Sequence, residues 1–350
     1  MKPEHNKATL FVGGLIIILS CVCCVSTRQS VDFSLDNVDS VFVEQYLRLN
    51  QIELAGIGPI VFWQQDQVIV ADGELPSLLS LIDLGTGRKK PFLKMGRGPG
   101  ECLGIQNLTV KNKILYAYSL ASKKMIALQE AVDTSLVFSL VNDIPIKEEC
   151  LRLIPSPECG FVGTPRKGPR FYSFSETGEV NGSFGSFPNV NGEPDAINNM
   201  SLQSEISFSP DGMYFCSPFL MVDYIEIYSD NYSKIRRLWG PEPFVPQVER
   251  VSDGLASYYS QKPPKDVFRT LSVSDKGFLV GYIGHLNTSR DEPVKTTREL
   301  LYFSWNGDLI RRYILPEQLA YFDVDWENGR MCGITFEVEP KLVQAKLDGI

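Results

Sequence analysis

A short polar or glycine-containing turn between two apolar, β-rich runs recurs along this chain. The turns are Asp83–Arg88, Gln129–Thr134, Ser175–Glu179, Ser229–Ser233, Trp305–Asp308 and Leu347–Gly349. Most of them are about 45 residues apart, and a repeat of about 40–50 residues with several strands is typical of a β-propeller. Six turns therefore predict an all-β, six-bladed propeller of four-stranded antiparallel blades over residues 41–350. The longest step predicts an insertion at about 241–266.

The last turn, Leu347–Gly349, follows the third strand of its blade, and Ile350 ends the sequence. The β-rich segment Val41–Leu49 precedes the first complete blade and is left over. We therefore expect this N-terminal strand to complete the last blade and close the ring, which removes an open sheet edge. The alternative is an isolated edge strand.

Residues 1–20 have the features of a targeting segment, with Lys2 and Lys7 before an apolar run, Leu10–Leu19, that is short for a bilayer span. The run ends in Ile-Leu-Ser-Cys, which resembles a bacterial lipobox with Cys21 as the lipid-modified residue. Residues 21–40 would then be a polar tether. The alternatives are an uncleaved signal anchor and an ordinary secretory signal.

Glycine is densest in Lys94–Glu101, which the repeat places between the first and second blades. The spacing matches neither the dinucleotide-binding pattern nor a phosphate-binding loop. Pro99-Gly100 is the pair that a type II turn requires. We therefore interpret the segment as a connector whose tight turn presents Arg97 and Glu101, and a ligand contact by either side chain is left open.

Part of this region resembles one NHL-type propeller repeat, and a later turn resembles the Ser-Pro-Asp-Gly turn of TolB-type propellers. The segments that match the NHL-type repeat are Gly98–Cys102, Leu108–Val110, Lys113–Tyr118 and Lys123–Ile126. The TolB-type turn is Ser209–Gly212. With the lipobox, the whole chain looks like the TolB-like six-bladed propeller lipoproteins of Bacteroidota-type envelopes. That resemblance implies a fold and an envelope location, and it implies no assigned activity.

The chain has a net charge of −8, with 34 Lys and Arg against 42 Asp and Glu. An acidic domain argues against nucleic acid as a partner and against a broad footprint on anionic membranes. Attachment to an outer membrane would come from the lipid, on its periplasmic or exterior side, and we expect a monomer. Cys150 and Cys159 are close enough in sequence for one disulfide, and buried thiols are the default for the remaining cysteines.

The sequence offers little for catalysis. His285 is the only histidine after the targeting segment, so a multi-histidine zinc site cannot form. Asp323, Asp325, Glu327 and Asn328 are the best candidates for a calcium site, but their spacing differs from an EF-hand loop and a solvated strand face explains them better. We therefore predict no catalytic residue, no metal site and no cofactor.

Two further groups could contact a ligand or partner. Arg166, Lys167 and Arg170 form a basic segment that, with Arg97, could meet an anionic ligand or could simply be solvated. Tyr258 and Tyr259 lie in the predicted insertion and could contact a partner or a sugar ring.

The favoured function is binding or scaffolding of an envelope protein or a glycan. The alternatives are a calcium-dependent propeller hydrolase or lactonase and an accessory of outer-membrane transport or sensing.

Overall fold

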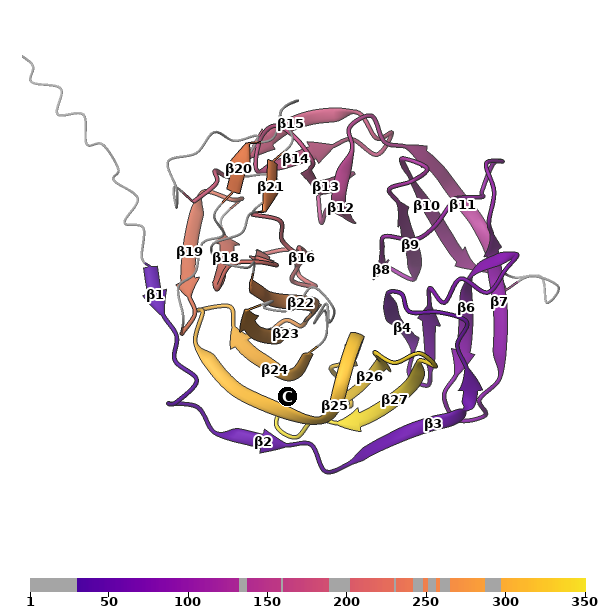
Figure 1. The fold of residues 1–350 in the computed structure, drawn as a ribbon. Coiled ribbons are helices and arrows are strands. Elements are labelled where there is room, and N and C mark those ends of the chain that lie inside the picture. The colour runs from indigo at the N-terminus through magenta and orange to yellow at the C-terminus, as the bar shows by residue number, and fades with distance from the viewer. Residues whose placement is uncertain are drawn as a thin grey trace, which may run out of the picture.

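The computed structural model is a ring of β-sheets arranged around a central axis (Figure 1). It describes residues 30–131, 137–158, 160–188, 202–229, 231–241, 248–250, 256–258, 265–286 and 297–350. Each blade is an antiparallel sheet whose innermost strand lies nearest the axis, so the predicted all-β propeller is confirmed.

Four blades are separate sheets. Blade one comprises β4 (Ile60–Gln64), β5 (Gln67–Val70), β6 (Ser77–Asp83) and β7 (Lys89–Lys94). Blade two comprises β8 (Asn107–Lys111), β9 (Ile114–Ser119), β10 (Lys124–Glu130) and β11 (Phe138–Pro145). Blade three comprises β12 (Cys150–Pro155), β13 (Phe161–Pro165), β14 (Phe171–Phe174) and β15 (Val180–Phe184). Blade four comprises β16 (Ser207–Phe208), β17 (Tyr214–Pro218), β18 (Tyr224–Ser229) and β19 (Lys234–Trp239).

The last two blades share one long strand. Blade five comprises β22 (Lys265–Val273), β23 (Gly277–Leu286), β24 (Thr297–Ser304) and the first half of β25 (Leu309–Asp325). Blade six comprises the second half of β25, β26 (Arg330–Thr335), β27 (Lys341–Lys346) and β3 (Tyr46–Glu53). Pro316, which has no backbone N–H to donate, lies where β25 changes its partner. The eight-stranded sheet is therefore two blades, and the ring has six.

The ring closes as predicted, although with different bounds. β3 pairs antiparallel with β27 and supplies the fourth strand of blade six, so the closing strand is Tyr46–Glu53. The earlier residues of the predicted segment belong elsewhere, because β2 (Ser40–Phe42) pairs in parallel with β25 in blade five.

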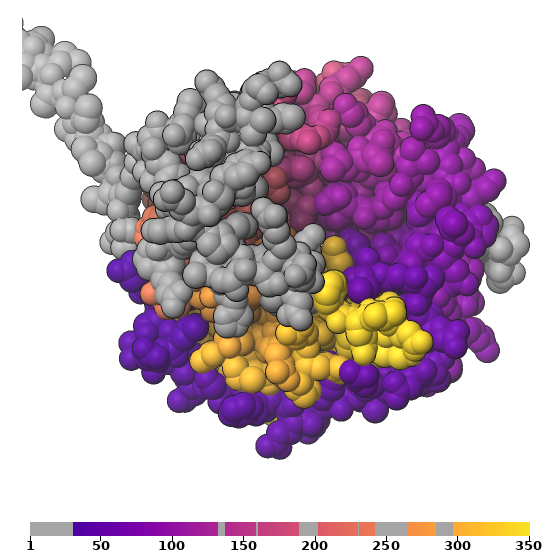
Figure 2. All heavy atoms as spheres, viewed as in Figure 1, coloured from indigo at the N-terminus to yellow at the C-terminus, as the bar shows by residue number. Residues whose placement is uncertain are grey.

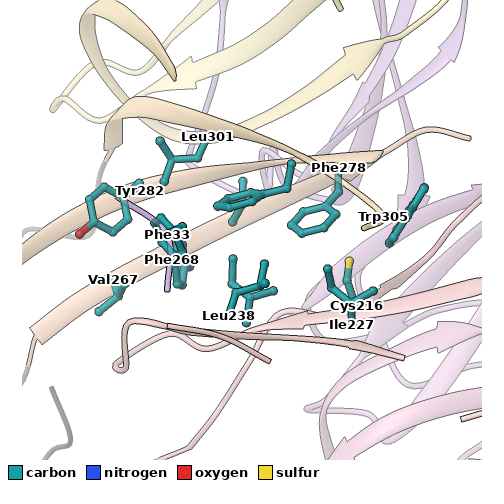
Figure 3. Close-up of a cluster of buried hydrophobic side chains, with 13 residues drawn as sticks. Phe33, Cys216, Ile227, Leu238, Val267, Phe268, Phe278, Tyr282, Leu301 and Trp305 are labelled. Carbon is teal, nitrogen blue, oxygen red and sulfur yellow. The ribbon is translucent and has the colours of Figure 1, made fainter. Parts of the chain in front are cut away.

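The polar tether predicted for residues 21–40 also needs correction for its second half. β1 (Ser30–Asp32) pairs in parallel with β19, so the N-terminal chain follows the outer rim across blades four, five and six (Figures 1 and 2). Phe33 is only 7% exposed and lies among side chains of blades four and five, including Leu238 and Phe268 (Figure 3). Burial of Phe33, with Leu35 packed against the same cluster, therefore helps to hold this segment on the rim.

Five of the six turns used for counting join the third and fourth strands of blades one to five, and the last, Leu347–Gly349, follows the third strand of blade six. Residues 132–136 of the second turn lie outside the described residues. The turns Ser209–Gly212 and Trp326–Gly329 join the first and second strands of blades four and six, with Gly212 and Gly329 at positive φ. All these turns lie on one side of the ring, which we call the turn face, because successive strands of each meander reverse direction.

The predicted insertion contains a small two-stranded sheet of β20 (Val248–Arg250) and β21 (Ala256–Tyr258), which is separate from the blade sheets. Cys102, Cys150, Cys216 and Cys332 are free and buried. Cys159, the partner considered for Cys150, lies outside the described residues, as does Cys21. Within the described ranges, no helix is long and apolar enough to cross a membrane.

Candidate ligand site in the central channel

A cavity of about 440 Å³ lies at the axis of the ring. Its lining comes from the first strands of all six blades: β4, β8, β12, β16, β22 and the second half of β25. The volume lies in the range of small-molecule binding sites. Apolar groups such as Ile60 and Phe62 share the lining with hydroxyl-bearing residues such as Thr109 and Ser207. The ring therefore holds a preformed site of mixed polarity.

An ion pair at the channel wall joins blades three and four. The guanidinium of Arg152 donates to both carboxylate oxygens of Glu205, at 2.7 Å from Nε and 2.6 Å from Nη2. Burial alone would raise the pKa of Glu205, but the charge and hydrogen bonds of Arg152 outweigh it and hold that pKa below its ordinary value. The pair is therefore charged at neutral pH and leaves no net charge in this part of the channel.

Residues of blades five and six lie beside this pair. Tyr321 and Arg269 both interact electrostatically with Glu205, and Arg269 also donates a 2.7 Å hydrogen bond to Asp266. Burial raises the pKa of the Tyr321 hydroxyl, so it is neutral and remains a donor at physiological pH. Polar side chains from four blades therefore interact beside the channel.

Asp323 braces the channel nearer the turn face. Its Oδ2 accepts a 2.8 Å hydrogen bond from the backbone N–H of Phe62, and its Oδ1 accepts a 2.7 Å bond from Ser272 Oγ. Burial raises the pKa of this carboxyl despite those two bonds. The side chain thus links the innermost strands of blades one, five and six.

Lys111 is the last residue of β8, and its side chain also lines the cavity near the turn face. Its ammonium donates to the backbone carbonyl of Ser156 in blade three. Burial lowers the pKa of Lys111, and no described carboxylate raises it in compensation. Among the described residues that line the cavity, Arg152 is paired with a carboxylate and Lys111 is not.

The structure confirms the tight turn predicted for the glycine-rich connector. Glu101 N–H donates to the Gly98 carbonyl at 3.1 Å, and Gly100 has a φ of +71°. Glu101 folds back on the loop, where its carboxylate accepts a 3.0 Å bond from Gly98 N–H that lowers its pKa. Arg97 is exposed, and neither it nor Glu101 lines the cavity. A role for these two side chains in partner contact stays a prediction.

The basic segment splits into two environments. Arg166 and Lys167 are exposed, and Arg166 pairs with Glu149 at 2.9 Å. Arg170 is only 2% exposed, so its prediction as a surface contact needs correction. Its guanidinium donates to Ser204 and Ser217 and lies over the rings of Phe171 and Phe219; it is also 3.4 Å from the Glu226 carboxylate. These contacts draw it out of the loop and into the core of blade four.

The acidic cluster is not a uniformly solvated strand face, because Asp323 and Asp325 are partly buried and only Glu327 is exposed. Asp325 pairs with Arg330 at 2.8 Å and accepts a bond from Asn328, so it organises the turn after β25. Within the described ranges, no three His, Cys, Asp or Glu side chains gather closely enough to hold a metal ion. Tyr259 lies outside the described residues, and only the backbone is described for Tyr258 and His285.

Sequence reasoning missed the polar residues of the channel, Lys111, Arg152 and Glu205. Each lies in or next to the first strand of its blade, which is the strand that follows the connector from the preceding blade. Polar side chains at that position of several repeats are a signal that could have pointed to the axis. Their pairing across blades could not be read from the sequence, because Arg152 and Glu205 are 53 residues apart.

The fold and its axial cavity define a six-bladed β-propeller with a central cavity. The chain belongs to the TolB-like 6-blade propeller-like family, whose model matches residues 68–327. No curated protein matches it in sequence.

Two solved structures from Bacteroides share the fold. One is a Bacteroides fragilis protein described as exported, with a TM-score of 0.54 and 12% identity over 91% of this chain and 100% of that one. The other is a member of the DUF4221 family from Bacteroides vulgatus, with a TM-score of 0.55 and 11% identity over 87% of this chain and 96% of that one. At these identities the likeness shows the fold alone.

Proposed function

We propose that this protein is a binding module of a bacterial cell envelope, anchored by a lipid at Cys21, whose central channel takes part of a glycan or protein partner. The observation that carries the proposal is the preformed cavity of about 440 Å³ lined by all six innermost strands. The channel carboxylates favour binding over calcium-dependent hydrolysis, because Glu205 is engaged by Arg152 and Asp323 by Phe62 and Ser272. Those oxygens brace the ring.

The lipobox-like Ile18-Leu19-Ser20-Cys21 supports the anchor, and the similar structure of an exported Bacteroides protein is consistent with it. The test is fractionation of cells that produce Cys21→Ala. We expect this variant to leave the membrane fraction and Cys24→Ala to remain there. Persistent membrane association of Cys21→Ala would contradict the anchor.

The channel is tested by filling it. Ser207→Trp places a large ring in the lining, whereas Ser40→Trp places the same ring on the exposed rim. Both variants and the wild type would be screened against soluble envelope glycans and peptides, with thermal unfolding to verify the fold. We expect ligands to bind the wild type and Ser40→Trp and to lose binding to folded Ser207→Trp. Binding that Ser207→Trp leaves unchanged, or no ligand at all, would overturn the channel as the site.

A further inference from the structure

Charge in the channel is almost fully matched within the protein. Arg152 and Glu205 neutralise each other through two hydrogen bonds, and neither needs a ligand. Asp323 already accepts two hydrogen bonds, which hold it against blades one and five. Of the four charged side chains in the lining, three therefore have a charged group that makes two hydrogen bonds within the protein.

Lys111 is the exception. An ammonium has three donors, and the carbonyl of Ser156 accepts one of them. The side chain is half-buried, so water does not fully solvate its charge. A cation held at the wall of a cavity, with donors to spare and with no described acidic neighbour, is well suited to an anionic group of a ligand.

The surroundings of Lys111 suit a polyhydroxylated ligand. Asp323 lies toward the same face, because it is near the end of β25 as Lys111 is at the end of β8. A carboxylate offers about four lone-pair positions, and the protein fills two of those on Asp323. The partly buried rings of Phe62 and Tyr321 add apolar faces to the lining. Hydroxyl acceptors beside aromatic faces are what a sugar ring requires.

We propose that the channel binds an anionic saccharide, with Lys111 contacting its charged group and Asp323 accepting hydrogen bonds from its hydroxyls. This inference rests on the proposed function and specifies the ligand class of the same site. The anionic group could be a carboxylate, as in a uronic acid, or a phosphate, since an ammonium binds both.

The test compares the affinities of glucuronate, glucose 6-phosphate, glucose and glucosamine for the full chain, measured by ligand-observed NMR titration. We expect one or both anionic sugars to bind about tenfold or more tightly than glucose, the preference typical of a charge-assisted hydrogen bond. Which anionic sugar binds better distinguishes a carboxylate ligand from a phosphate ligand. Equal binding of charged and neutral sugars, or a preference for glucosamine, would overturn the inference.

Lys111→Met removes the charge and keeps the length of the side chain. Lys113→Met is the matched control, because Lys113 is exposed in the same turn and does not line the cavity. We expect Lys111→Met to abolish the preference for anionic sugars, and Lys111→Arg and Lys113→Met to keep it. A preference that survives in Lys111→Met would contradict the role of this residue.

The two proposals fail differently. If glucose and the anionic sugars bind equally and Ser207→Trp abolishes both, the channel is a binding site and the anionic ligand class is wrong. If no sugar binds and no ligand of the wider screen is sensitive to Ser207→Trp, both proposals fail.

Discussion

The carboxylate of Asp323 accepts a 2.8 Å hydrogen bond from the backbone N–H of Phe62, which joins the innermost strands of blades six and one. Asp323→Leu would leave this N–H and the Ser272 hydroxyl without an acceptor. A buried donor without a partner costs about 1–3 kcal/mol, so we expect a clear loss of unfolding free energy in urea. Asp39→Leu changes an exposed aspartate and should have little effect. Equal stability of both variants would contradict the bracing role.

The pair of Arg152 and Glu205 should be costly to break from one side. Arg152→Met leaves Glu205 in the channel without its cation, which typically costs about 3–5 kcal/mol. The double variant Arg152→Met/Glu205→Leu should recover much of this loss, because no lone charge remains. Arg166→Met is the control, since its exposed pair with Glu149 should contribute at most about 1 kcal/mol. Similar losses for the single and double variants would argue against the charge as the cause.

The same pair predicts a pH dependence. The pKa of Glu205 lies below its ordinary value of 4.5, so the folded state binds this proton less tightly than the unfolded state. The stability that it contributes is therefore present above about pH 4.5 and is lost as the pH falls further. In Arg152→Met, burial raises the pKa instead, so acid should relieve part of the defect. Urea titrations at pH 4 and pH 7 check whether the gap between variant and wild type narrows in acid.

Phe33 should hold the N-terminal chain on the rim. It is 7% exposed and packs edge-on against Phe303 with ring centroids 5.1 Å apart. Phe33→Ala should cost about 3–5 kcal/mol if the segment unfolds with the ring, because a buried phenyl group is removed. Val31→Ala alters an exposed neighbour in β1 and should change little. Chemical denaturation compares the two, and a negligible effect of Phe33→Ala would indicate that the N-terminal chain on the rim does not unfold together with the ring.

Closure of the ring depends on the inward side chains of β3. Leu49 is 3% exposed and packs in a cluster with Ile60 of blade one and Leu342 of blade six. Leu49→Ala should therefore cost about 2–5 kcal/mol. Leu47 of the same strand is 57% exposed, and Leu47→Ala should be close to neutral. If thermal unfolding shifts equally for both, the closing strand does not contribute through its core contacts.

Gly96 allows Glu101 to fold back over the connector. A Cβ at residue 96 would lie 2.0 Å from Glu101 Oε2, so Gly96→Ala must displace this carboxylate from its bond to Gly98. We expect a loss of about 1 kcal/mol, the usual contribution of one hydrogen bond. Gly85→Ala, where the nearest neighbouring atom is 3.7 Å away, is the matched control. Unchanged melting of Gly96→Ala would show that Glu101 does not stabilise the loop.

The architecture could be predicted from the sequence, because turns and alternating apolar runs are local signals that each blade repeats. The six turns after the third strands and the need for a closing strand followed from that pattern, and the Pro99-Gly100 pair predicted the type II turn. The bounds of the closing strand did not, since a β-rich segment contains no local signal for which neighbour it will join. Residues 40–42 therefore pair with blade five, and β3 closes blade six.

Which of the candidate side chains face solvent, the core or the channel depends on the tertiary structure. Arg166 and Arg170 belong to one basic segment, yet Arg166 is exposed and Arg170 is buried. Ser204, Ser217, Phe219 and Glu226, which contact Arg170, are all distant from it in sequence. Lys111 and Arg152 carry no motif, and they become channel residues because closure of the ring brings six first strands to one axis. Long-range contacts of this kind depend on how whole blades pack, so local sequence predicts the blades and leaves the chemistry at their centre to the fold.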